Sequence, residues 1–275
     1  MLYVGFDILP VHKYFWERAM DWLFSLSGFI VGLLVGMTGV GGGALMTPLL
    51  VLGFQIPPVV AVGSDLIFAA ATKSVGALTH GWQGTVQWRI VFLMAAGSVP
   101  STIVAINYLS ELQQHTELLG SIIQYTLSAA LLLTAVLMLF KSRILAAAKS
   151  TFGDITPKQE VIFTILTGVL LGALVTITSI GAGAMGIVIL TLLYPKLETS
   201  KIVGTDIAHA VPLTAIAGLG HFSLGSVDFN LVTLLLLGSI PGVYIGSRLT
   251  HLLPEKYVRI VLASILTGVG IKLLA

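Results

Sequence analysis

Long stretches without charged residues alternate with short polar segments along the whole chain. The two longest cover residues 22–64 and 161–195, and shorter ones cover 90–110, 118–140, 207–227 and 229–247. Each shorter stretch has about the 20 residues that a helix needs to cross a bilayer. A segment from Pro57 to His80 is interrupted by Asp65 and Lys73, and a last helix is expected from about Tyr257. This pattern predicts an all-α polytopic membrane protein.

A cluster of small residues interrupts each of the two longest apolar stretches. The first is Gly39-Val40-Gly41-Gly42-Gly43, and the second is Ser179-Ile180-Gly181-Ala182-Gly183. Unpaired backbone groups are costly inside a bilayer, so a broken helix at that depth must be buried in protein or line a cavity. Two broken segments at corresponding places in two halves indicate a binding site near the membrane midplane of a secondary transporter.

The two halves of the chain share motifs in a nearly constant register. Positions 32, 38, 41, 43 and 44 carry the same residues as positions 172, 178, 181, 183 and 184, which lie 140 residues later. At a spacing of 141, Val62-Gly63-Ser64-Asp65 matches Val203-Gly204-Thr205-Asp206, and Gly97-Ser98-Val99-Pro100 matches Gly238-Ser239-Ile240-Pro241. His80 and His221 share that spacing too. We interpret the chain as two homologous repeats.

The charges of the polar segments help to orient the two repeats. If each glycine-broken stretch spans once, the chain has eight spans and parallel repeats, with many basic residues outside. If each is a re-entrant hairpin, the repeats are inverted and most basic residues lie inside, as the positive-inside tendency favours. Ala44–Phe54 would extend about 16 Å as a helix, roughly half a bilayer. The sequence favours the inverted arrangement, with both termini external.

Composition excludes several classes of function. The chain has 275 residues, of which 56% are hydrophobic and only 9% charged, whereas soluble domains carry about 25% charged residues. A net charge of +2, without a basic face, gives no indication of nucleic-acid binding, and the absence of cysteine excludes disulfides and thiolate metal sites. No metal-ligand spacing or hydrolase motif is present, so we expect no cofactor, no metal and no enzymatic activity.

The glycine breaks are the first candidate binding residues. Half-helix N-termini in a cavity would present free backbone N–H groups to an anion, and two threonines before the breaks would add hydroxyl donors. This set contains Thr38, Gly41, Gly42, Gly43, Thr178, Gly181 and Gly183. The alternative is that glycines only permit close helix packing. We favour packing for the scattered Gly28, Gly32 and Gly36, and binding for the duplicated breaks.

Lys73 is a lysine deep inside an otherwise apolar helix, and its counterpart in the second half is Thr214. An ionisable residue at that depth indicates function, and a cation suits an anionic substrate. The alternative is an ion pair with Asp65, about two helical turns earlier. We favour substrate binding.

Three further polar residues are candidates for proton coupling: Asp65, Asp206 and His209. A buried carboxylate can take up a proton during transport. For the two acids we favour helix capping, in which Ser64 or Thr205 caps a helix and the acid complements its dipole. His80 and His221 end corresponding helices and are expected at a membrane interface.

The segment Gly36–Pro48, followed by Ala61-Val62-Gly63-Ser64-Asp65 and a Gly-Ser-x-Pro helix, resembles the TauE/SafE family of sulfite and organosulfonate exporters. The resemblance covers about residues 22–275. It implies a permease of the bacterial or archaeal inner membrane that moves small sulfur oxyanions or sulfonates outward. Where this chain has Asp65 and Asp206, the family often has a small or apolar residue, so these acids indicate a particular coupling or substrate.

Together these observations predict an N-terminal interfacial segment (1–21), repeat 1 (22–140), a cytoplasmic linker (141–160) and repeat 2 (161–275). Each repeat is expected to contain a glycine-broken hairpin and three transmembrane helices. The predicted function is secondary-active export of a small sulfur-containing anion, bound at the midplane between the breaks and moved by alternating access. A passive anion channel and, with less support, a membrane-embedded enzyme are the alternatives. The bilayer is a partner, and a homo-oligomer is left open.

Overall fold

The computed structural model describes residues 10–38, 43–151, 156–249 and 255–274, and these residues form helices with no strand among them. The all-helical prediction is confirmed. The long helices are α1 (Pro10–Thr38), α3 (Pro58–Trp82), α4 (Trp88–Glu111), α5 (Thr116–Thr151), α6 (Pro157–Thr178), α8 (Thr199–Ser223), α9 (Phe229–Leu249) and α10 (Glu255–Leu274). The short ones are α2 (Gly43–Pro48), a π-helix (Leu49–Gly53), a 3₁₀ turn (Leu112–Gln114) and α7 (Ala184–Leu193).

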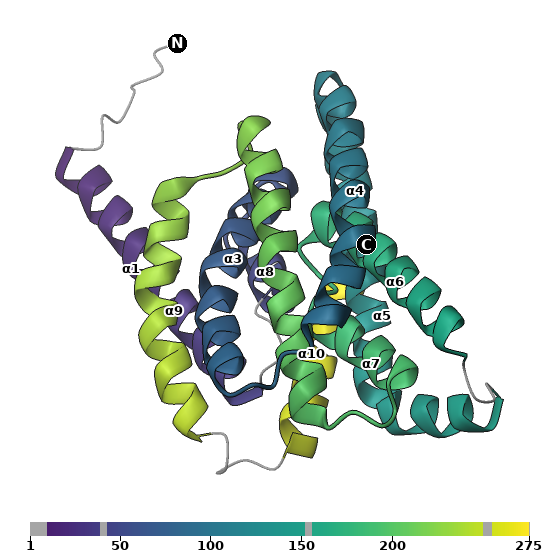
Figure 1. The fold of residues 1–275 in the computed structure, drawn as a ribbon. Coiled ribbons are helices and arrows are strands. Elements are labelled where there is room, and N and C mark those ends of the chain that lie inside the picture. The colour runs from purple at the N-terminus through teal and green to yellow at the C-terminus, as the bar shows by residue number, and fades with distance from the viewer. Residues whose placement is uncertain (1–9, 39–42, 152–155, 250–254, 275) are drawn as a thin grey trace.

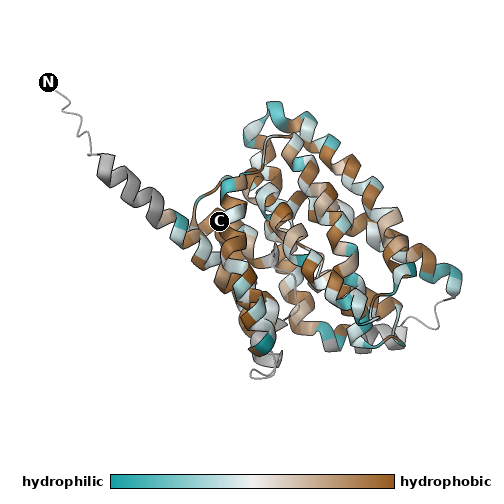
Figure 2. Cartoon of the chain, turned by 60° about the vertical axis from the view of Figure 1, so that its left-hand side comes forward, coloured by the Kyte–Doolittle hydropathy of each residue, from teal (hydrophilic) through white to brown (hydrophobic). Residues whose placement is uncertain are grey.

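Seven helices of the described chain are long and apolar enough to cross a membrane: α1, α3, α4, α5, α6, α8 and α9. Large apolar side chains such as Leu166, Leu237 and Ile240 are more than half exposed on the outside of the bundle. Hydrophilic residues gather at the helix ends (Figure 2). An apolar exterior of this kind requires a lipid environment, so the molecule is a multi-pass membrane protein.

Local sequence accounts for several helix boundaries. Thr156 caps α6 through a reciprocal capping box with Gln159, and Pro157 occupies the first turn. After α3 and α8 the backbone turns at Gly84 and Gly225, with φ of 66° and 69°. Glycine adopts such angles without steric cost, so α3 and α8, which hold corresponding places in the two halves of the chain, end with the same turn. The expected linker is helical over 141–151, where it continues α5.

Glycines bring two pairs of helices into close contact. A Cβ on Gly28 or Gly32 of α1 would collide with the backbone of Leu235 or Ser239 on α9. Gly168 and Gly172 of α6 pack in the same way against Met94 and Ser98 of α4. This confirms the packing interpretation of the scattered glycines. Because the residue numbers rise together in both pairs, α1 runs parallel to α9, and α4 runs parallel to α6.

The other two principal pairs run antiparallel. Gly76 of α3 lies against Ile207 of α8, whereas Gly63, near the start of α3, lies against His221 near the end of α8. In the pair of α5 and α10, Ser128 Oγ donates to Gly270 O at 2.5 Å and Gln124 Nε2 donates to Leu273 O at 2.8 Å. Each of these pairs joins a helix of the first half to the corresponding helix of the second half.

These directions describe the path of the chain around each glycine break. α1 and α3 run the same way, so the chain turns back between them through α2 and the π-helix (Figure 1). α6 and α8 also run the same way, and the short α7 returns between them. At the second break, the helix before the break is the longer one, since α6 has 22 residues whereas α7 has 10.

Candidate functional site

The second glycine break has a left-handed backbone that its small residues permit. Ser179 has φ of 59°, and Gly181 and Gly183 have φ of 128° and 119°. The Thr178 hydroxyl accepts a hydrogen bond from Ile180 N at 3.1 Å and donates to Leu174 O at 2.7 Å. It therefore stabilises the break itself, in addition to any role toward a ligand.

Lys73 crosses from α3 to this break. Its Nζ donates to Ala182 O at 3.2 Å, and the side chain is only partly buried. The ammonium also interacts electrostatically with Asp206 and Asp65. Neither carboxylate is close enough for a salt bridge to Lys73 among the described contacts. The alternative interpretation, an ion pair with Asp65, is thus reduced to a longer-range attraction, and the hydrogen-bond partner of Lys73 is the break.

The Asp65 carboxylate is anchored by one strong hydrogen bond. Its side chain has 0% exposure, and Thr47 Oγ1 of α2 donates to Oδ2 at 2.5 Å. The Ser179 hydroxyl, in the second break, interacts with this carboxylate without a hydrogen bond of normal geometry, and Oδ1 has no partner. Asp65 therefore connects α2, which follows the first break, to the second break.

The Asp206 carboxylate is held much more loosely. It is 1% exposed, and neither oxygen has a hydrogen-bond partner of normal geometry, although the Gly183 amide interacts with it. The carboxylate lies on the Cα of Gly186 in α7, where an added Cβ would stand 2.9 Å from Asp206 Cγ. A buried carboxylate without partners is costly in its charged form, so Asp206 is well suited to take up a proton.

His209 completes the cluster on α8. It has 0% exposure, and its Nε2 lies 2.9 Å from Ser98 Oγ of α4. Its Nδ1 has no partner, and the ring interacts electrostatically with Lys73. The structure thus brings together Lys73, Asp65, Asp206, His209 and the second break. Two carboxylates share one lysine, so the cluster carries a net charge of −1 when both acids are ionised and the histidine is neutral.

The capping role that the sequence favoured for Asp65 and Asp206 is wrong. α3 begins at Pro58 and α8 at Thr199, so both acids lie about two turns inside a helix. Their neighbours instead accept hydrogen bonds from the residues that precede helices in the other half of the chain. Ser64 Oγ accepts from Asp228 N and Thr205 Oγ1 from Gln87 N, each at 3.0 Å. These two hydrogen bonds hold the starts of α9 and α4.

The remaining predicted residues lie outside the described part of the chain or away from the Lys73 cluster. Gly41 and Gly42 lie outside the described residues; Thr38 ends α1 and Gly43 begins α2, and their side-chain surroundings are likewise outside the description. His80 is partly buried, with Nδ1 2.8 Å from Thr85 Oγ1. His221, expected at a membrane interface, is instead fully buried. No group of three potential metal ligands occurs among the described residues.

Four residues of the cluster were missed by the sequence argument: Thr47, Ser98, Ser179 and Gly186. Thr47 and Ser98 lie in motifs that stand out in the sequence, and Ser179 begins the second break. Their partners are on other helices, however, so spacing along the chain could not assign them a role. Gly186 carries no signal, because a glycine in an apolar helix is common in membrane proteins.

Comparisons with known proteins agree with this architecture. The family model described as "Sulfite exporter TauE/SafE" matches residues 24–273. The "Probable membrane transporter protein YjnA" of Bacillus subtilis is 41% identical over 255 residues, covering 90% of this chain and 98% of that protein. The "Probable membrane transporter protein MJ0441" of Methanocaldococcus jannaschii is 26% identical, covering 92% and 94%. No solved structure matches the chain.

The relatives are named as transporters rather than enzymes, in agreement with the predicted absence of enzymatic activity. The match spans both breaks, both buried acids and Lys73. The chain therefore belongs to the TauE/SafE family of membrane transporters.

Proposed function

We propose that this protein is a secondary-active exporter of a small sulfur-containing anion, such as sulfite or an organosulfonate, in the cytoplasmic membrane. The observation that carries the proposal is the position of Lys73. Its ammonium donates a hydrogen bond to the backbone of a helix break and interacts electrostatically with two buried carboxylates. An anion entering here meets a cation that no carboxylate binds directly.

The charges of the cluster support coupling to protons. Adding a monovalent anion to a site with a net charge of −1 would bring the charge to −2 in a buried environment, which is unfavourable. Protonation of one carboxylate removes this penalty. Asp206 is the better acceptor, because its oxygens lack hydrogen-bond partners, whereas Thr47 stabilises the charged form of Asp65. One proton would then accompany the anion in the loaded site.

The proposal includes an inverted arrangement of two repeats, each with a re-entrant hairpin. It is supported by the antiparallel contacts of α3 with α8 and of α5 with α10, since parallel repeats would give corresponding helices the same direction. The short return of the chain through α7 supports the hairpin. Asp65 and Asp206 then approach the site from opposite membrane faces, as alternating access requires.

A passive channel is the nearest alternative, and a membrane-embedded enzyme has less support. A channel would need an open path on both sides and no exchange of bound states. The cluster of Asp65, Lys73, Asp206 and His209 favours a carrier, because buried ionisable residues mark substrate and proton pathways in transporters. An enzyme would need a nucleophile with a base or a metal cluster, and the described residues contain no such metal cluster.

Counterflow in proteoliposomes tests the function. Liposomes loaded with one unlabelled anion and diluted into a labelled trace should accumulate the label transiently if the protein is a carrier. Sulfite, thiosulfate, sulfate and sulfoacetate form the panel, with empty liposomes as the control. We expect accumulation of at least one anion of this panel, and an increase when the proton gradient drives protons in the same direction as the labelled anion, because one proton would accompany the anion. Flux that merely follows the gradient, without accumulation, would identify a channel.

A further inference from the structure

Three buried side chains that carry oxygen meet at the Asp65 carboxylate. Asp65 lies on α3, Thr47 on α2 and Ser179 in the second break, and none of them is more than 4% exposed. Thr47 Oγ1 donates to Asp65 Oδ2 at 2.5 Å, and the Thr47 amide and the Ser179 hydroxyl also interact with the carboxylate. Asp65 Oδ1 and Ser179 Oγ nevertheless have no hydrogen-bond partner of normal geometry. Two such oxygens in one buried place are costly unless a ligand binds them.

The charge at this place is negative, and no basic side chain of the described residues contacts it. Lys73 attracts Asp65 only at longer range, since its Nζ donates to Ala182 O. α6 ends at Thr178, directly before Ser179, so the negative end of its helix dipole lies beside the carboxylate. A buried carboxylate and the C-terminal end of a helix both favour a positive charge. A small cation between them would therefore stabilise both.

The two hydroxyl groups belong to this acid and have no counterpart for Asp206. In the register of 140 residues that relates the two halves, Ile187 corresponds to Thr47, and Gly39 corresponds to Ser179. The oxygens of Asp206 accordingly lack hydrogen-bond partners of normal geometry. The chain thus holds two different buried acids, one with further side-chain oxygens around it and one without. The two acids are therefore suited to different ions.

A set of oxygens with a single carboxylate suits Na⁺. A hydroxyl oxygen has two lone pairs, so Thr47 Oγ1 can donate its proton to Asp65 and still bind a cation. Transition metals favour nitrogen and sulfur ligands, and no group of three potential metal ligands of the His, Cys, Asp or Glu type occurs among the described residues. Ca²⁺ is usually bound by more than one carboxylate. Na⁺ is bound in other transporters by oxygens at the ends of broken helices, as Ser179 is placed here.

We propose that Asp65, Thr47 and Ser179 form a Na⁺ site, in which Asp65 Oδ1 and the two hydroxyl oxygens bind the ion together with carbonyl oxygens at the end of α6. The inference goes beyond the proposed function and rests on it only for the role of the ion in transport. With Na⁺ at Asp65 and a proton on Asp206, the cluster carries a charge of +1. A monovalent anion at Lys73 brings this charge to zero. Na⁺ therefore favours binding of the anion, and by linkage the anion favours binding of Na⁺.

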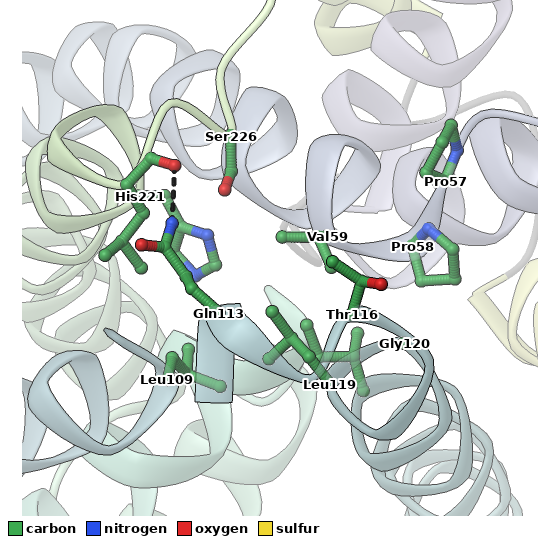
Figure 3. Close-up of a pocket in the computed structure, with 12 residues that line it drawn as sticks. Pro57, Pro58, Val59, Leu109, Gln113, Thr116, Leu119, Gly120, His221 and Ser226 are labelled. Carbon is green, nitrogen blue, oxygen red and sulfur yellow. Dashed lines mark hydrogen bonds between the residues drawn. The ribbon is translucent and has the colours of Figure 1, made fainter. Parts of the chain in front are cut away.

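A cavity of about 570 Å³ approaches this site from the ends of the helices. It is enclosed by the start of α3, the turn between α4 and α5, and the end of α8, and Figure 3 shows Gln113 and His221 at one end of it. Its wall includes Val59 but none of the three side chains that bind the ion. Val59 precedes Asp65 by about 9 Å along α3. The cavity is thus the space from which an ion enters, and a bound ion is enclosed.

Binding of Na⁺ can be measured on the purified protein without any transport. Thermal melting at constant ionic strength, with NaCl replacing choline chloride, gives the apparent affinity, and equilibrium binding of radioactive Na⁺ measures it directly. An ion that binds only the folded protein raises the melting temperature in a saturable way. Choline has the same charge but is too large for a buried site. Equal melting temperatures in the two salts would overturn the proposal.

Variants of the three side chains test whether they bind the ion. Asp65→Asn keeps the size of the side chain and should lower the affinity for Na⁺ by at least about tenfold, because the charge is lost. Ser179→Gly suits the left-handed backbone, with φ of 59°, and should lower the affinity about fivefold. Thr47→Val should have a similar effect, whereas Thr47→Ser should bind as the parent does. Thr191→Val is the matched control, because the Thr191 hydroxyl donates to Ile187 O within α7.

The other acid supplies a second control. Asp206→Asn should keep the response to Na⁺, so an equal loss in Asp206→Asn and Asp65→Asn would overturn the site. Unchanged affinity in Asp65→Asn would overturn it too, and if that variant does not fold, unchanged affinity in both Ser179→Gly and Thr47→Val would do so. A larger stabilisation by Ca²⁺ than by Na⁺ would overturn the choice of ion.

Binding and transport can fail separately. Na⁺ binding that Asp65→Asn abolishes, without transport of any anion in the panel, would refute the proposed function and support the Na⁺ site. Transport of an anion by a protein that does not bind Na⁺ would overturn the Na⁺ site and leave the proposed function intact.

Discussion

Gly186→Ala is a direct test of how Asp206 is held. Gly186 lies inside α7 with ordinary helical geometry, so the substitution causes no backbone strain. The added Cβ would overlap Asp206 Oδ1 and stand 2.9 Å from Cγ. The carboxylate must therefore move away from its position beside Gly183. In most helices the same change is favourable, since alanine exceeds glycine in helix propensity by about 1 kcal/mol.

The expected free-energy change follows from these two opposing effects. Overpacking of a buried site costs about 1–3 kcal/mol, and the gain in propensity offsets about 1 kcal/mol of that. The net destabilisation should be about 0–2 kcal/mol, accompanied by loss of proton-coupled transport. Gly268→Ala, which meets no neighbour, should instead stabilise the protein by up to about 1 kcal/mol. Melting temperatures in one detergent would measure the difference.

A double-mutant cycle isolates the contact. Asp206→Ala removes the colliding carboxylate, so Gly186→Ala should become neutral or stabilising in that background. The coupling free energy should be at least about 1 kcal/mol, within the range for residues in contact. A coupling near zero, or a Gly186→Ala variant as stable as Gly268→Ala with normal transport, would refute the packing of Asp206 on Gly186.

Three further outcomes follow from the same structure. Asp206→Asn should remove the dependence of transport on a proton gradient while counterflow persists. Asp65→Asn should have a smaller effect, because Thr47 stabilises the charged form of Asp65. If both variants behave like the parent, coupling through these acids is excluded. Thr205→Val should lower the free energy of unfolding by about 1 kcal/mol, measured by thermal melting, because the start of α4 loses its acceptor. In this cysteine-free chain, Glu111→Cys should react with an impermeant maleimide from outside, whereas Lys196→Cys should react only after permeabilisation.

Much of the fold could be predicted from the sequence because the bilayer restricts which structures can span it. Uncharged stretches of about 20 residues must form helices in a bilayer, and the duplicated motifs identify the corresponding helices. The interpretation of the scattered glycines as packing residues is confirmed by Gly28 and Gly32. The helix boundaries were predicted less well. Pro58 and Thr199 begin helices that include Ser64 and Thr205, so these residues do not cap the helices that contain them.

The candidate site was predictable only in part. Lys73, Asp65, Asp206 and His209 stand out because ionisable residues are rare in apolar helices, and the structure brings them together. Which acid is anchored and which is free depends on contacts between helices. The second half of the chain has Ile187 at the position that Thr47 holds in the first half, 140 residues earlier, so Asp206 has no equivalent hydroxyl donor. Such asymmetry becomes visible only when the helices are packed.

Anion binding by Lys73 variants tests the central claim most directly. Isothermal titration of the purified protein should use the anion that gives the strongest counterflow, with Lys158→Met at the exposed start of α6 as the matched control. Lys73→Met should weaken binding by at least about tenfold, as expected for loss of a charged hydrogen bond worth about 1.5–3 kcal/mol. Lys73→Arg should keep part of the affinity, because the charge persists in a wider group. If Lys73→Met is folded and binds the anion as tightly as the parent and Lys158→Met, Lys73 does not hold the substrate, and the account of the transport site is wrong.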